Sequence, residues 1–357
     1  MQGKPVLQKI IAIDLLRALA ALGVFYFHNH SGTLLVKYSG IRWLKVTDAL
    51  GAIYAVPLFF LISGYCIHAS NIKHLKANQS LPVKEYYRRR FLRIYPPYFA
   101  ALLFAILVNY LVIPNYQLGI YDGIVHLFSL QGFTTPYFNT INLVLWTISI
   151  ELAFYAIYPV FYYIRFKYNL NYALGFTFIV SCLSVTYFML KGDYSVPERF
   201  CVFNLWFAWC TGAYLADKKM LSTTDFTKPV YIILYLFIFF CLLYLGYTHS
   251  TLSIIQDQLD ILVWTAPMIF LLSKEEWLRQ KQHSWIIRIF AAIGLSSYSL
   301  YLLHDPLIAL KNFLVHKYFP VSFQLPGVGL GILLIPVVAW YSYYYIEKPF
   351  IHKKSRE

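Results

Sequence analysis

Long apolar segments alternate with short polar ones along the whole chain. A helix needs about 20 consecutive apolar residues to cross the hydrocarbon core of a bilayer. We expect ten segments to do so: about 10–30, 49–70, 94–114, 143–164, 170–190, 200–216, 229–248, 258–273, 289–310 and 324–346. The stretch 121–131 is shorter and more polar, and we expect an interfacial or re-entrant piece there. The pattern predicts an all-α, polytopic membrane helix bundle.

The composition supports a membrane protein. Of the 357 residues, 59% are hydrophobic and 13% are charged, whereas a soluble globular protein has about 25% charged residues. The chain shows no internal repeat, low-complexity tract or long linker, so we expect one membrane domain over 1–357 with no appended extracytoplasmic domain. Asp14 and Arg17 interrupt the first apolar segment, which predicts a retained helix rather than a cleaved signal peptide.

The basic residues indicate how the helices are oriented. With the N-terminus placed inside, the predicted inner segments hold 22 Lys and Arg residues and the outer segments hold 7. This bias agrees with the positive-inside rule and predicts that both termini are cytoplasmic. The net charge of +14 is therefore concentrated on one face, where it suits anionic membrane lipids. Nothing in the pattern requires nucleic acid.

Arg17 and His28 lie on one face of the first predicted helix. They are 11 residues apart, which corresponds to about 20° more than three turns and a rise of about 16 Å. Charged groups at membrane depth are costly and normally face a cavity or the bundle interior, so the pair is a functional candidate. Asp14 shares this face, which leaves a plainer interpretation open: Asp14 neutralises Arg17, and His28 only anchors the helix at the interface.

Four arginines gather at the cytoplasmic start of the third predicted helix, namely Arg88, Arg89, Arg90 and Arg93. A guanidinium group matches the geometry of phosphate with two parallel hydrogen bonds. The cluster therefore predicts a binding site for a phosphorylated donor that arrives from the cytosol. Topology alone would also explain a cluster of this kind.

Other polar residues interrupt the later apolar segments. Glu151 lies about one third of the way into its helix, and an acidic residue at that depth is a functional candidate. Trp146 and Ser149 are close to it in sequence, and we expect both to contact substrate, Ser149 by a hydrogen bond rather than as a nucleophile. His304, at the outer end of the ninth predicted span, is either another polar contact there or an interfacial residue. Glu347 is expected to pair with the arginine cluster and close the bundle.

The sequence predicts no metal site and no disulfide framework. The five cysteines are scattered and form no CxxC motif. His28 and His30 would diverge by about 200° on a helix, unlike the i,i+4 histidine pair of a zinc site.

Six motifs in order resemble the acyltransferase-3 family of bacterial inner-membrane acyltransferases, which O-acylate surface polysaccharides and related glycans. They run nearly from end to end: R-x10-H (Arg17, His28), PLFFLISGYCI (57–67), RRRFLRIYPPY (88–98), LWTISIELAFYAIYP (145–159), SYSLYLLHDPL (297–307) and EKPF (347–350). The resemblance implies a ten-helix bundle in the bacterial cytoplasmic membrane. It also implies transfer of an acyl group, commonly acetyl, from cytosolic acyl-coenzyme A to a hydroxyl on the outer side. Some members carry a secreted hydrolase-like domain after the bundle.

The family's central R-x10-H pair falls on Arg17 and His28. In the mechanism that we expect, the arginine cluster holds the coenzyme A phosphates and His28 acts as general base on the acceptor hydroxyl. Glu151 would orient His28 or the acceptor, and Arg17 would hold the donor or stabilise oxyanion charge. The residues leave open whether an acyl-histidine forms.

Two other classes of protein remain as alternatives. An exporter of polysaccharide or lipid-linked sugar would also use charged residues inside the membrane, although transporters often show repeated halves and this chain shows none. A non-catalytic scaffold would leave Arg17 and Glu151 without a purpose. The sequence leaves open the acceptor sugar, the length of the acyl group, a homo-oligomeric state and the role of His68.

Overall fold

A computed structural model describes residues 10–192, 194–221, 233 and 253–352. Within them the chain is helical and contains no strand. The first half comprises α1 (Ile11–His28), α2 (Ser31–Ser39), η1 (Arg42–Lys45), α3 (Val46–Lys76), α4 (Val83–Val112), α5 (Ile120–Leu127), η2 (Gln131–Phe133) and α6 (Trp146–Lys167). The second half comprises α7 (Leu170–Lys191), α8 (Val196–Arg199), α9 (Val202–Leu221), α11 (Ser253–Val263), α12 (Thr265–Ser273), α13 (Glu275–Gln280), α14 (Trp285–Leu295), α15 (Ser297–Tyr318), α16 (Val321–Ser342), the π-helix η3 (Tyr343–Glu347) and α17 (Lys348–His352).

Seven described helices are long and apolar enough to cross a membrane, or eight if the bent pair α14–α15 counts as one span. This confirms a polytopic membrane helix bundle. The predicted span 200–216 overlaps α9, whose last turns carry charged residues at 217–219. The predicted span 229–248 lies outside the described residues, apart from residue 233. At 121–131 the chain forms the eight-residue helix α5 and the turn η2, which are too short to cross.

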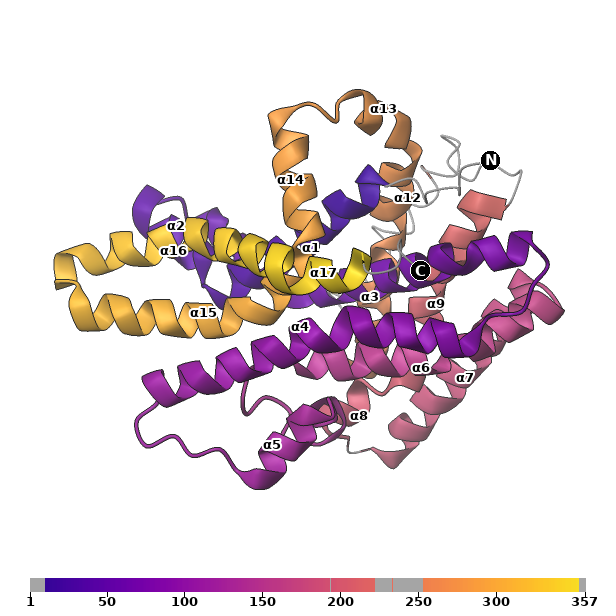
Figure 1. The fold of residues 1–357 in the computed structure, drawn as a ribbon, viewed down its shortest axis with the longest axis horizontal. Coiled ribbons are helices and arrows are strands. Elements are labelled where there is room, and N and C mark those ends of the chain that lie inside the picture. Colours follow the sequence, from indigo (N-terminus) through magenta and orange to yellow (C-terminus); the bar gives the residue numbers. More distant parts are fainter. Residues whose placement is uncertain (1–9, 193, 222–232, 234–252, 353–357) are drawn as a thin grey trace.

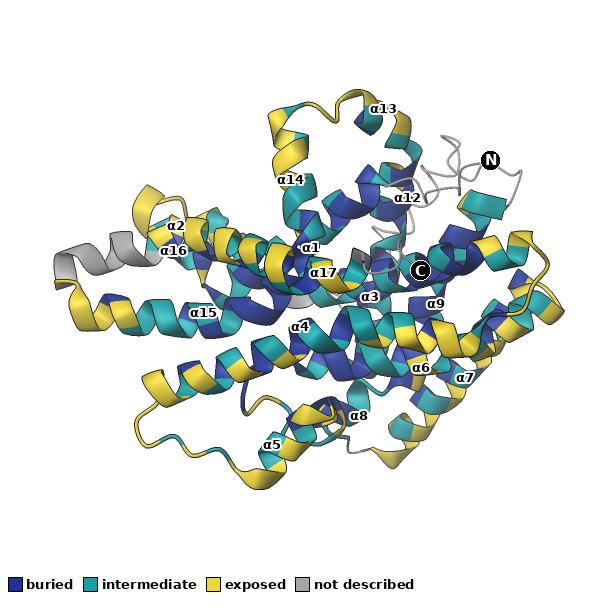
Figure 2. Cartoon of the chain, viewed as in Figure 1, coloured by how far each residue is buried: buried dark blue, intermediate teal, exposed yellow. Residues whose placement is uncertain are grey.

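The outward faces of the bundle are apolar. Figure 2 shows exposed residues along the outside of α4, α7 and α16. On α4 the leucines Leu103, Leu107 and Leu111 are spaced one turn apart and are each 51–56% exposed. Such a stripe would be unfavourable in water, whereas lipid chains cover it without cost. The stripe therefore marks a lipid-facing surface.

Glycines let the central helices approach closely. Helix α3 packs against both α1 and α9 (Figure 1). A Cβ atom on Gly64 would lie 2.1 Å from the carbonyl oxygen of Trp209, and one on Gly212 would lie 2.1 Å from that of Leu61. Small residues at helix contacts let two backbones pack tightly in a membrane. This pair fixes α3 against α9.

Helix α1 is fixed by α13 and α14. Glu275 of α13 accepts hydrogen bonds from the backbone N–H groups of Ile11 (3.1 Å) and Ala12 (2.9 Å), and therefore caps α1. On α14, a Cβ atom at Gly294 would lie 1.9 Å from the carbonyl oxygen of Asp14. These contacts set the depth and rotation of the helix that carries Arg17 and His28.

Replacing Glu275 with alanine removes the cap of α1. We expect the free energy of unfolding to fall by about 1 kcal/mol, the usual effect of losing an N-terminal cap. The thermal unfolding midpoint in detergent measures this change. The Glu276→Ala variant is the control, because Glu276 is exposed and makes no hydrogen bond to α1 among the described contacts. An equal loss in both variants would contradict the capping role.

The chain bends by 74° between α14 and α15. The bend falls at Ser296, whose hydroxyl donates to the carbonyl oxygen of Ala292 at 3.2 Å. It turns the start of α15 toward the centre of the bundle, where Ser297, Tyr298 and Tyr301 reach a cavity. The continuous apolar segment predicted at 289–310 therefore consists of two helices in different directions.

Candidate active site

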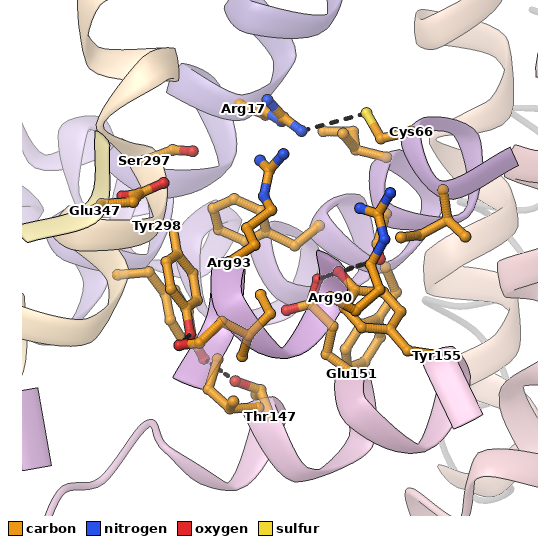
Figure 3. A pocket seen from close by; sticks show the side chains of 18 of the residues that line it. Arg17, Cys66, Arg90, Arg93, Thr147, Glu151, Tyr155, Ser297, Tyr298 and Glu347 are labelled. Carbon is orange, nitrogen blue, oxygen red and sulfur yellow. Dashed lines mark hydrogen bonds between the residues drawn. The ribbon is translucent and has the colours of Figure 1, made fainter. Parts of the chain in front are cut away.

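A cavity of about 160 Å³ lies at the centre of the bundle, between α1, α3, α4, α6, the start of α15 and the π-helix η3 (Figure 3). We call it the arginine cavity. Its charged and polar lining consists of Arg17, Ser63, Cys66, Ser70, Arg90, Arg93, Thr147, Glu151, Tyr155, Ser297, Tyr298, Tyr301 and Glu347. Of the sequence-predicted site residues, Arg17, Arg90, Arg93 and Glu151 therefore lie around one space.

Three guanidinium groups face the arginine cavity without an ion pair to a carboxylate among the described residues. Arg17 donates to the Sγ atom of Cys66 at 3.3 Å, rather than to Asp14 on its own helix. Arg90 donates through Nη2 to the Ser70 hydroxyl at 2.8 Å, and its buried Nε has no hydrogen-bond partner. Figure 3 shows Arg93 beside them, also pointing into the space. The cavity therefore has positive charge available for an anionic or electron-rich ligand.

The two carboxylates of the cavity are hydrogen-bonded to hydroxyl groups. Glu151 accepts hydrogen bonds from the hydroxyls of Tyr155 and of Ser63, the latter at 3.2 Å. Glu347 is 2% exposed and accepts from the Ser299 hydroxyl at 2.8 Å. Glu347 thus lines the same cavity as Arg90 and Arg93, but it forms no direct ion pair with the arginine cluster among the described residues.

His28 lies outside the lining of the arginine cavity and packs on His304. The two ring centroids are 5.0 Å apart, and we call these residues the histidine pair. In His304 the Nδ1 atom lies 2.7 Å from the carbonyl oxygen of Tyr301. Because a carbonyl only accepts, Nδ1 carries a proton, and in the neutral ring Nε2 then holds the lone pair. That buried Nε2 has no hydrogen-bond partner.

Tyr301 stands between the arginine cavity and the histidine pair. It lines the cavity, and its ring centroid lies 5.7 Å from that of His304 and 5.5 Å from that of Phe59. Its hydroxyl accepts a hydrogen bond from Thr147 at 2.7 Å and donates to the carbonyl oxygen of Val144 at 3.2 Å. Arg17 and His28 share a helix face, as expected, but Tyr301 separates their surroundings.

Two of the four predicted donor-binding arginines lie away from the cavity. Arg88 is exposed. Arg89 pairs with Glu85 at 2.8 Å and donates to the side-chain oxygen of Asn71 at 3.3 Å. The spacing of the four arginines along α4 turns only Arg90 and Arg93 inward.

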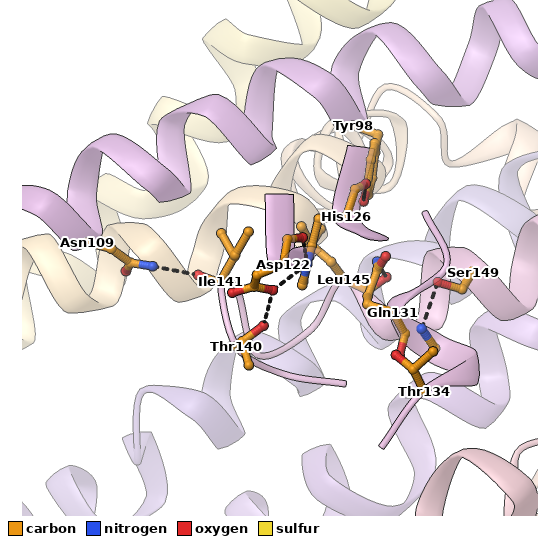
Figure 4. Close-up of polar contacts among 11 residues, drawn as sticks. Tyr98, Asn109, Asp122, His126, Gln131, Thr134, Thr140, Ile141, Leu145 and Ser149 are labelled. Atoms are coloured by element: carbon orange, nitrogen blue, oxygen red, sulfur yellow. Dashed lines mark hydrogen bonds and ion pairs between the residues drawn. The ribbon is translucent and has the colours of Figure 1, made fainter. Parts of the chain in front are cut away.

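Trp146 and Ser149 also do not line the arginine cavity. Trp146 stacks on Phe138 and Phe200, with ring centroids 4.9 and 4.6 Å away. Ser149 accepts a hydrogen bond from the backbone N–H of Gly132 at 3.0 Å, which joins the start of α6 to η2 (Figure 4). These contacts brace the segment before α6, so the structure gives both residues a packing role.

The sequence reasoning missed a polar stripe on α3. Ser63, Cys66 and Ser70 line the cavity and contact Glu151, Arg17 and Arg90 respectively. Their i, i+3, i+7 spacing places them on one helix face. This regular spacing of polar residues in an apolar segment could have revealed the stripe from the sequence.

His68 belongs to a separate buried cluster. Its ring nitrogens lie 3.0 Å from the Tyr158 hydroxyl and 2.9 Å from an Asp217 carboxylate oxygen. Arg165 also pairs with Asp217, at 2.7 Å. The cluster joins α3, α6 and α9 and accounts for His68 as a structural residue.

Comparison with known proteins defines the class. A family model described as an acyltransferase domain matches residues 10–344. The chain therefore belongs to the acyltransferase-3 family, and it is a multi-pass membrane protein of that family. No solved structure matches the chain.

Two similar proteins carry related names. The peptidoglycan O-acetyltransferase OatA of Listeria monocytogenes is 28% identical over an alignment of 171 positions, which covers 45% of this chain and 25% of that protein. The O-acetyltransferase OatA of Staphylococcus aureus strain NCTC 8325 is 26% identical over an alignment of 384 positions, which covers 96% of this chain and 57% of that protein. The chain thus spans a quarter to somewhat over half of the length of these relatives.

Proposed function

We propose that this protein is an O-acyltransferase that moves an acyl group, in the simplest case acetyl, from cytosolic acyl-coenzyme A to a hydroxyl of a surface glycan. The observation that carries the proposal is the arginine cavity, where Arg17, Arg90 and Arg93 gather and form no ion pair with a carboxylate in the described part of the chain. Buried charges are normally paired. Three unpaired guanidiniums around one space therefore favour a ligand that brings oxygen-rich or negative groups.

The donor would enter from the arginine-rich end of α4. Arg90 and Arg93 would bind the polar part of acyl-coenzyme A, and the exposed Arg88 would add long-range attraction for its phosphates. The cavity suits the acyl and thioester end of the donor rather than its nucleotide. Arg17, on the opposite wall, would stabilise the negative oxygen that develops on the thioester carbonyl.

The acceptor hydroxyl would be activated by the histidine pair. His28 would take the proton as the hydroxyl oxygen attacks the thioester carbon. The tetrahedral intermediate would then break its carbon–sulfur bond, and His28 would return the proton to the leaving thiolate. Tyr301 would have to move aside for the two substrates to meet. Glu151 is held by Tyr155 and Ser63 in the cavity and would position the donor side rather than His28.

Transfer across a membrane tests this proposal. Purified protein is reconstituted in sealed vesicles with labelled acetyl-coenzyme A on one side and a peptidoglycan-derived oligosaccharide on the other. We expect label on the oligosaccharide only when the donor faces the arginine-rich ends of the helices. The His30→Gln variant serves as the control and should retain transfer, because His30 is exposed and lies outside the arginine cavity. Movement of unlabelled glycan without acylation would instead support the exporter.

A further inference from the structure

Lys311 of α15 lies near the C-terminal end of α1, where neighbouring residues hold its side chain in place. The side chain is half-buried, and its Nζ donates to the side-chain oxygen of Asn29. A Cβ atom on Gly331 of α16 would lie 2.1 Å from Cδ of Lys311, so the glycine leaves room for the lysine stem. Among the described residues, no carboxylate forms an ion pair with Lys311. A partly buried ammonium group that is hydrogen-bonded to a neutral amide keeps a positive charge that can bind an anion.

Asn29 is held in the orientation that Lys311 needs. It is 5% exposed, and its Nδ2 donates to the Ser31 hydroxyl at 3.0 Å. That bond directs the amide oxygen toward Lys311. The contact positions the ammonium group without neutralising it.

Lys311 and the histidine pair face the same end of α1. Lys311 follows His304 by seven residues, which is about 20° less than two full turns of the helix. The two side chains therefore lie on the same face of α15, about 10 Å apart along the helix axis. His304 contacts His28, while Lys311 contacts the next residue, Asn29. A long lysine stem can shorten the remaining gap, so the ammonium group and the imidazoles can reach one sugar residue together.

We propose that Lys311 binds an anionic substituent of the acceptor, a carboxylate or a phosphate, while the histidine pair receives a hydroxyl of the same sugar residue. This inference rests on the proposed function and adds the class of acceptor to it: an acidic glycan. The ammonium group acts as a point charge, which suits either anion. Lys311 is thereby a residue for acceptor specificity and takes no part in the bond-making step.

A pair of acceptors that differ only in charge tests the inference. The disaccharide of N-acetylglucosamine and N-acetylmuramic acid carries one carboxylate, and its methyl ester carries none. With the wild-type protein in vesicles and labelled acetyl-coenzyme A, we expect a KM about tenfold lower for the acid than for the ester, the usual effect of one charge-assisted hydrogen bond.

Two variants separate charge from packing. Lys311→Gln keeps an N–H donor for Asn29 but removes the charge, so we expect the KM for the acid to rise to that of the ester while kcat is unchanged. Lys317→Met is the control on the same helix, because Lys317 is exposed and its ammonium group lies over the Phe313 and Tyr318 rings. It should leave both KM values unchanged.

Three outcomes would overturn the inference in distinguishable ways. Equal KM values for acid and ester in the wild type would assign the charge of Lys311 to lipid phosphate. A Lys311→Gln variant that loses transfer to both acceptors equally would show a structural role. Absence of label on every acceptor in the wild type would overturn the proposed function and this inference with it.

Discussion

Replacing His28 with glutamine is expected to lower the rate of acyl transfer by about 10²- to 10⁴-fold, the range by which a positioned general base accelerates a reaction. Glutamine keeps a polar side chain of similar length but cannot accept and return the proton. The loss should appear in kcat, because in the proposed mechanism the donor binds in the arginine cavity, on the other side of Tyr301. Steady-state kinetics with labelled acetyl-coenzyme A measure both constants.

The neighbouring His30→Gln variant is the matched control. His30 is exposed and lies two residues further on, outside the contact with His304. It should transfer at the wild-type rate. If His28→Gln retains most of its kcat, or if it loses the cooperative thermal transition that His30→Gln keeps, the assignment of His28 as the base is wrong.

Replacing Arg90 with glutamine is expected to raise the KM for the acyl donor by about 10- to 100-fold, since hydrogen bonds to a charged group contribute roughly 1.5–3 kcal/mol. The same substitution should leave the thermal stability unchanged or raise it. In the folded protein the Arg90 guanidinium is desolvated and its Nε has no partner, so removing the charge relieves an unfavourable burial. Weaker donor binding combined with undiminished stability is the signature of a residue retained for its ligand.

Arg88→Gln is the control for this experiment. The two arginines are two residues apart on α4, and Arg88 is exposed. Its substitution should change the donor KM only slightly, and the change should vanish at high salt because exposed charges are screened. Equal effects of the two substitutions would place the donor on the surface of the bundle instead of in the cavity.

Intramembrane charge was the strongest signal in the sequence. Arg17 and Glu151 interrupt apolar helices, and both line the arginine cavity. The cost of exposing a charge to lipid forces such residues inward, so their meeting could be expected without knowing the helix arrangement. This argument does not extend to Trp146 and Ser149, which lie outside the lining of the arginine cavity. A tryptophan or a serine costs little in either environment, and nearness to Glu151 in sequence does not determine which way a side chain points.

The position of His28 shows another limit of sequence reasoning. Helical periodicity correctly placed it on the face of Arg17, yet periodicity says nothing about what covers that face at each depth. Tyr301 reaches this place because the chain turns sharply at Ser296, within a segment whose hydropathy is continuous. Hydropathy indicates which residues can contact lipid, but it does not depend on the direction of the helix. The bend, and the place of Tyr301 between the arginine cavity and the histidine pair, could therefore only be found in the structure.

The position of Tyr301 also matters for the permeability of the membrane that contains the protein. A channel open from cytosol to exterior would let protons and sodium ions leak and would discharge the electrochemical gradient that drives ATP synthesis. Tyr301 is held by hydrogen bonds of its hydroxyl with Thr147 and Val144, and its ring contacts Phe59 and His304, so it stands between the arginine cavity and the histidine pair. If the protein transfers an acyl group as proposed, this arrangement would let a two-carbon fragment cross the bilayer while the membrane remains insulating.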